Sequence, residues 1–135
     1  MKNVAQVESV IRARYDGDAT LVATATRLLF GFPEADEFSK RPWIAVTIEG
    51  FEDVSAFGSQ FKTDYSAVVK HASNSPQIDK VSNMSRRFHD RFHQTKLSGT
   101  GITAMWLLHV GSEGPLVVDG AAEIIDRYTV AVDWA

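Results

Sequence analysis

Residues 43–49 read Trp-Ile-Ala-Val-Thr-Ile-Glu, and the other predicted strands are compared with this stretch. Three branched apolar side chains, Ile44, Val46 and Ile48, alternate with smaller or polar ones. This two-residue period is typical of a β-strand that buries one face and leaves the other toward solvent. Pro42 comes just before the strand and forces the preceding residue into an extended conformation. The stretch therefore predicts one strand of a sheet that is covered on one face.

Further along the chain, residues 60–70 and 125–134 alternate in the same way. Residues 102–109 are apolar on both faces, which is typical of a central strand. Residues 111–114 contain two glycines and predict a turn, after which residues 115–118 are expected to be extended. The sequence therefore predicts a mostly antiparallel sheet of about four strands.

Two other stretches have the periodicity of helices. Asn3 and Gln6 have the spacing of a capping box, and apolar side chains then recur at helical intervals until Tyr15. Ser75-Pro76 places an N-cap residue and a proline ahead of an amphipathic segment that runs to Phe92. We expect an N-terminal helix and a long helix that lies across the sheet.

Residues 1–135 contain no repeat or linker and are long enough to bury a core, so they predict a single domain. Residues 19–26 fit a short helix, whereas residues 27–30 fit either a strand or a continuation of that helix, because so short an apolar run is ambiguous. We expect a helix followed by a strand. The expected fold class is α+β, with a mostly antiparallel sheet of about four strands, a long amphipathic helix packed on one face, and an N-terminal helix.

The composition excludes several classes of function. A net charge of -3 disfavours binding to nucleic acid or to an anionic membrane. The chain has no cysteine, which excludes disulfides, thiolate zinc sites and cysteine nucleophiles. No apolar run approaches the roughly 18 residues of a membrane span, and the first residues do not resemble a signal peptide. We expect a soluble protein, made inside the cell, with no membrane partner.

His89 and His93 are the strongest candidates for chemistry, because two histidines four residues apart on a helix can ligate one metal ion. Zinc proteases place a glutamate after the first histidine, whereas Asp90 follows it here, and the sequence shows no third ligand. The flank of an amphipathic helix accounts for the pair better. Serine-nucleophile and phosphate-loop motifs do not occur. We expect no enzyme activity, no cofactor and no metal.

Two predicted connections are more apolar than solvated loops need to be. One is the predicted hairpin loop after residue 49, and the other is the extended arm at residues 115–118. Exposed apolar groups of this kind mark contacts with another protein. We expect subunit interfaces at Phe51, Val54 and Phe57 in the first connection, and at Pro115, Leu116 and Val117 in the second.

The order of these motifs resembles a known protein family. The residues that carry the resemblance are Arg41-Pro-Trp-Ile-Ala-Val, Phe61-Lys-Thr-Asp-Tyr, the helix at 75–92, Val118-Asp-Gly, and Arg127-Tyr-Thr-Val-Ala-Val-Asp-Trp134. Taken in order, they are similar to the tail-terminator or tail-completion (head-tail joining) proteins of long-tailed bacteriophages and phage-like particles. The resemblance covers most of the chain, but the family has no catalytic or binding motif that could be transferred residue by residue.

The resemblance implies a structural virion protein located in the tail or neck, after synthesis in the host cytoplasm. It implies a homo-oligomer, a hexameric ring that caps the tail tube, ends tail polymerisation and offers its other surface to the head connector or stopper protein. The implied partners are thus the tail tube protein and the connector, without nucleic-acid sequence recognition. A ring subunit needs two complementary surfaces on different sides, which the two apolar segments can supply.

Two alternatives stay open at this level. A ferredoxin-like module that binds a small regulatory ligand between subunits would use the same pattern of helices over strands. A metal-dependent enzyme built on His89 and His93 is the other alternative.

Overall fold

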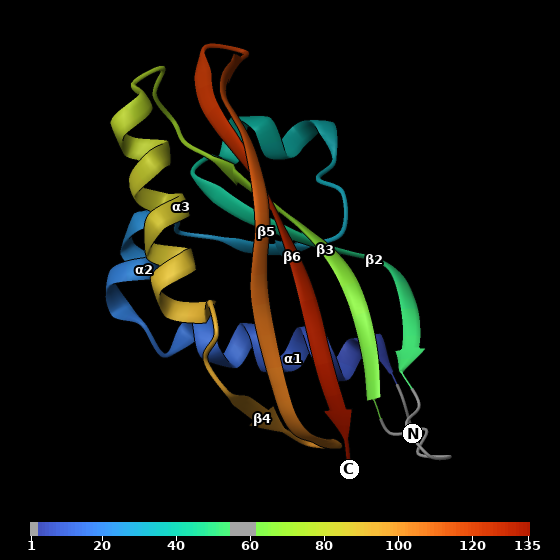
Figure 1. Ribbon diagram of the computed structural model, residues 1–135. Coiled ribbons are helices and arrows are strands. Elements are labelled where there is room, and N and C mark those ends of the chain that lie inside the picture. Colours follow the sequence, from blue (N-terminus) through green and yellow to red (C-terminus); the bar gives the residue numbers. More distant parts are fainter. Residues whose placement is uncertain (1–2, 55–61) are drawn as a thin grey trace.

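A six-stranded sheet dominates the computed structural model, which describes residues 3–54 and 62–135 (Figure 1). The strand order across the sheet is β1-β2-β3-β6-β5-β4. Neighbouring strands are antiparallel except for β1 and β2, which pair in parallel. The strands are β1 (Leu28–Phe30), β2 (Trp43–Val54), β3 (Lys62–Ala72), β4 (Leu97–Gly99), β5 (Ile102–Val118) and β6 (Ala121–Trp134).

Three α-helices and one 3-10 helix accompany the sheet. They are α1 (Val4–Asp16), α2 (Ala19–Thr24), η1 (Ala35–Lys40) and α3 (Ile78–Phe92). The helix α1 begins at the predicted cap, where the Asn3 side chain accepts a hydrogen bond from the Ala5 N–H at 2.8 Å. The Gln6 side chain does not complete the capping box but donates to the Thr100 carbonyl oxygen instead. Within the part of the chain that the structure describes, no helix is long and apolar enough to cross a bilayer.

The predicted fold class, a mostly antiparallel sheet of about four strands with one long helix on its face, is wrong. The sheet is mixed, it has six strands, and strands account for more of the described chain than helices do. Residues 28–30 form the strand that was expected after the short helix, whereas β4 was missed; β1 and β4 are three residues each and lie at the two edges of the sheet. So short a strand has no periodicity of its own, and its existence depends on the neighbour to which it is hydrogen-bonded.

Strand β5 is also longer than expected. The sequence predicts a turn at residues 111–114, but the strand continues for 17 residues and pairs with β6 throughout. Register shifts between His109 and Gly111 and between Glu113 and Leu116 show that the extra residues form bulges. The long β5–β6 hairpin therefore projects past the end of β3 as an arm (Figure 1).

The core lies between the sheet and the helices. On α3 the buried side chains are Val81, Met84, Phe88 and Phe92, and the last two stack with ring centroids 4.3 Å apart. The helix starts at Ile78, three residues later than the predicted cap, and Ile78 itself is exposed. On the other face of the sheet, η1 covers Trp43, whose indole N–H donates to the Glu37 carbonyl oxygen at 2.9 Å.

Candidate interaction surfaces

The arm formed by β5 and β6 presents apolar side chains to solvent. Leu116 and Val117 are each 60% exposed and Val110 is 68% exposed, while Pro115 is exposed beside them. The predicted extended arm at residues 115–118 is thus part of a regular strand and not a loose connection. Its place at a subunit interface stays a prediction.

A second exposed apolar residue lies near the far end of β2. Phe51 is 72% exposed, and its ring is tilted against that of Tyr65 with centroids 6.1 Å apart. The sequence predicted a loop here, but β2 continues past a bulge at Gly50 as far as Val54. Phe57 lies outside the described residues, and of the predicted set only the side chain of Phe51 is described.

The sheet also has stretches of open edge. In the described chain, β1 pairs with β2 only up to Val46, and β4 pairs with β5 only up to Met105. Beyond these points β2 and β5 have backbone groups with no outer strand beside them, apart from a bridge between His93 and Leu107. Open edges of this kind are ready to pair with another chain.

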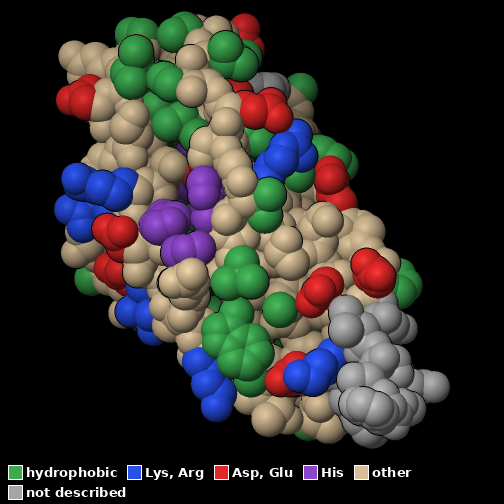
Figure 2. All heavy atoms as spheres, in the orientation of Figure 1, with side chains coloured by type: hydrophobic (Ala, Val, Ile, Leu, Met, Phe, Trp, Pro, Cys, Tyr) green, Lys and Arg blue, Asp and Glu red, His purple; other side chains and the backbone are tan. Residues whose placement is uncertain are grey.

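Helix α3 and strand β5 bring three histidines together at the surface (purple in Figure 2). The rings of His89 and His93 stack with centroids 4.4 Å apart, and the ring of His109 lies 5.4 Å from that of His89. Loss of solvent, together with the nearby His89 and His109, lowers the pKa of His93. Yet no three His, Asp or Glu side chains among the described residues are arranged to hold a metal ion. The metal-dependent alternative therefore gains no support from this geometry.

A buried polar network lies beneath the histidines, and sequence reasoning missed it. Asp126 of β6 is 1% exposed and accepts hydrogen bonds from Ser85 Oγ (2.6 Å) and Ser112 Oγ, with His71 Nε2 2.9 Å away. Burial by itself would raise the pKa of Asp126, but the hydrogen bond and charge of His71 and the bonds from Ser112 and Ser85 lower it well below its ordinary value.

This network links β3, α3, β5 and β6. The Ser112 hydroxyl donates to the Asp126 carboxylate, and its oxygen lies 3.0 Å from His109 Nε2. The sequence contains only a weak indication of this buried network. Asp126 and His71 occupy inward positions of alternating strands, in line with Tyr128 and Val69, where apolar residues are expected.

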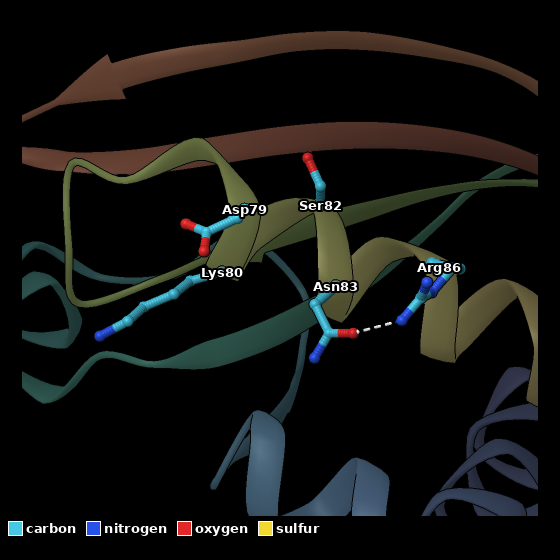
Figure 3. Close-up of a pocket in the computed structure, with 5 residues that line it drawn as sticks. All are labelled: Asp79, Lys80, Ser82, Asn83 and Arg86. Atoms are coloured by element: carbon cyan, nitrogen blue, oxygen red, sulfur yellow. Dashed lines mark hydrogen bonds between the residues drawn. The ribbon is translucent and has the colours of Figure 1, made fainter.

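The solvent-facing side of α3 carries several basic side chains (Figure 2). A hollow of about 490 Å³ is lined by residues of this helix alone: Asp79, Lys80, Ser82, Asn83 and Arg86 (Figure 3). Within it, Arg86 Nη2 donates to Asn83 Oδ1 at 2.8 Å. Small-ligand sites are usually built from groups that converge from several elements, so this hollow does not favour the ligand-binding alternative.

A second hollow, of about 270 Å³, lies where α3 meets the end of α1. Three arginines and two aspartates line it: Arg14, Asp18, Arg87, Asp90 and Arg91. Arg14 and Arg91 each donate to the backbone oxygen of the other at 3.0 to 3.1 Å, which fixes both side chains beside one another. Burial and the charge of Arg91 lower the pKa of Arg14. A nearby anion would therefore stabilise the charged form of Arg14.

The sequence matches no protein-family model and no curated protein. Among solved structures, a chain from the virion of a native gene transfer agent (GTA) particle superposes with a TM-score of 0.72 at 12% identity, covering 96% of each chain. A second solved chain superposes with a TM-score of 0.56 at 10% identity, covering 95% of this chain and 96% of the other. The likeness is one of fold, and it extends over nearly the whole of each chain.

Proposed function

We propose that this protein is a structural component of a phage-like particle and not an enzyme. The observation that supports this is the fold that it shares, over 96% of both chains, with a chain of a gene transfer agent virion. Its own surface is consistent with assembly, because Phe51 and the pair Leu116 and Val117 are exposed in two separate places.

Within such a particle, the role that fits best is that of the tail terminator. Six copies would form a ring that caps the tail tube, ends tail polymerisation and presents its other surface to the head connector. A closed ring uses a heterologous contact, in which each subunit offers two different surfaces. Phe51 at the end of β2 and the tip of the β5–β6 arm lie at opposite ends of the sheet, which suits such a contact (Figure 1).

Native mass spectrometry tests this proposal, first on the protein alone and then on its mixture with the tail tube protein of the same genome. We expect either a closed ring of six copies or capture on the ends of tubes. Val117→Asp places a charge in the exposed apolar arm and should reduce assembly. Ser98→Asp, which adds the same charge on exposed β4, is the matched control.

A protein that stays monomeric and binds no tube would contradict the proposal. Assembly of Val117→Asp at the wild-type concentration would remove the arm from the interface but leave the structural role standing.

A further inference from the structure

Helix α3 carries positive charge that the subunit itself does not neutralise. Its sequence has four basic and two acidic residues. Among the residues that the structure describes, Arg91 lies 3.9 Å from an Asp18 oxygen, whereas Lys80, Arg86 and Arg87 have no carboxylate within 4.0 Å. Arg87 Nε is buried and has no hydrogen-bond partner in the described chain. We call Lys80, Arg86 and Arg87 the basic helix face.

Strands β2 and β3 carry uncompensated negative charge on one face of the sheet. Glu52 is paired directly across from Asp64, and Glu49 is paired with Ser66, so all three carboxylates lie on the same face. Like charges directly opposite one another destabilise a pair of strands. Within the described ranges, none of the three carboxylates has a Lys or Arg nitrogen within 4.0 Å. We call Glu49, Glu52 and Asp64 the acidic strand face.

The two surfaces lie on different sides of the molecule. In Figure 2 most Lys and Arg side chains lie along the α3 side, with acidic side chains among them, and acidic side chains outnumber basic ones on the side of β2 and β3. Contact between two identical basic faces, or two identical acidic ones, would be repulsive. Contact between one face and the other is attractive and repeats from copy to copy, which is the property that a ring requires.

We propose that the acidic strand face of one copy docks on the basic helix face of the next copy. The inference rests on the proposed ring and specifies how neighbouring subunits meet. The hollow beside Lys80 and Arg86 also holds the donors Asn83 and Ser82, so that two cations and two neutral donors share it with one carboxylate, Asp79 (Figure 3). Arginine is well suited to this role because its planar group can hold a carboxylate through two parallel hydrogen bonds.

Charge exchange between the two faces tests the docking. The first variant is Arg86→Glu/Arg87→Glu, and the second is Glu49→Lys/Glu52→Lys. Each alone should need about tenfold or more protein to assemble, because like charges then meet at every contact. An equimolar mixture should recover assembly, since reversed basic and reversed acidic faces attract each other again. Native mass spectrometry should show that the recovered species contain equal numbers of the two variants. The assay is run on the protein alone and on tail tube ends.

Lys40→Glu/Lys96→Glu is the matched control for the first variant, because it makes the same change in net charge at two exposed lysines outside both faces. It should assemble like the wild type. Recovery in the mixture also shows that both test variants fold.

Three results would overturn the docking. In the first, both variants assemble as well as the wild type, which refutes the docking of the two faces but leaves the ring proposal intact. The mixture could fail to recover assembly although both variants are folded. The Arg86→Glu/Arg87→Glu variant could assemble normally but lose binding to a single-stranded DNA oligonucleotide, which would assign the basic helix face to a phosphate-bearing partner. If the wild type assembles neither alone nor on tubes, the proposed function fails first and the docking fails with it.

Discussion

At the scale of single residues, Asp126 has the most demanding environment in the protein. It is almost fully buried, and its carboxylate is held by His71, Ser85 and Ser112 from three other elements. Asp126→Asn keeps the shape of the side chain but removes the charge, and leaves donors without an anionic partner. We expect the free energy of unfolding to fall by about 3 kcal/mol. Urea denaturation followed by circular dichroism measures it.

Arg127→Gln is the control for this change. Arg127 neighbours Asp126 in sequence, but its ion pair with Glu113 is formed by side chains that are 50% and 59% exposed. Exposed pairs of this kind contribute about 0–1 kcal/mol. If the free energy of unfolding fell equally in the two variants, the buried network would contribute no more to stability than an exposed ion pair.

The lowered pKa of Asp126 also fixes the sign of a pH effect. The unfolded chain takes up its proton at about pH 3.9, whereas the folded protein resists protonation to lower pH. The stability that the carboxylate contributes is therefore complete above the unfolded value and is lost as the pH falls through the folded one. The difference in unfolding free energy between wild type and Asp126→Asn should narrow below about pH 4. A difference that widens on acidification would refute this assignment.

The sequence shows why single residues such as Asp126 are hard to assign. The alternation in β6 correctly places Asp126 on the same face as Tyr128 and Val130, which are buried. It does not show which side chains lie across from it, because His71 and Ser85 are 55 and 41 residues away in the chain. A buried acid could thus be suspected from periodicity, but its partners require the tertiary structure.

At the scale of elements, the longest strand depends on a glycine that the sequence places in a turn. Gly114 has φ +99, and a Cβ added there would lie 3.0 Å from the Glu123 carbonyl oxygen. Gly114→Ala should destabilise the β5–β6 arm by about 1–2 kcal/mol, because a side chain is strained in this conformation. Thermal denaturation of the variant gives the value.

Gly111→Ala in the same strand provides the comparison. A Cβ at Gly111 meets nothing within 4 Å, and its φ lies outside the left-handed range. This variant should keep wild-type stability or gain slightly from the reduced freedom of the unfolded chain. If both alanine variants behaved alike, the bulged path of β5 through Gly114 would be wrong.

Local patterns predicted the long elements better than the short ones. The alternation in residues 60–70 and the amphipathic period up to Phe92 correspond to β3 and α3, each shifted by two or three residues. Strand β4 could not be found in this way, because three residues form a strand only when a neighbour supplies the hydrogen bonds. Strand β1 was expected after the helix at residues 19–26, but its run of residues fits a helix as well. The parallel pairing of β1 with β2, which makes the sheet mixed, is likewise a property of chain path and not of local sequence.

At the scale of the whole molecule, the net charge conceals how the charges are arranged. A value of -3 correctly describes the chain but not its surface, where a basic helix and an acidic pair of strands lie on different sides. Sequence reasoning found the apolar candidates Leu116 and Val117 because exposed apolar residues stand out in a predicted connection. It could not find the charged surfaces, since Glu52 and Asp64 become neighbours only through the register of β2 and β3.

The charged docking and the apolar arm predict opposite responses of assembly to salt. Raising NaCl from about 0.1 M to about 1 M shortens the Debye length from about 10 Å to about 3 Å. Contacts between the basic helix face and the acidic strand face should therefore weaken, whereas apolar contacts through Leu116 and Val117 should not. We expect the concentration at which half of the wild-type protein is assembled to rise with salt, as measured by light scattering.

A chain that carries both charge reversals, Arg86→Glu/Arg87→Glu together with Glu49→Lys/Glu52→Lys, sharpens this prediction. Each contact in it again joins opposite charges, so it should assemble by itself and lose assembly with salt as the wild type does. If salt leaves assembly of the wild type unchanged or strengthens it, the ring is held by its apolar surfaces alone. In that case Val117→Asp, and not the charge reversals, should decide whether the ring forms.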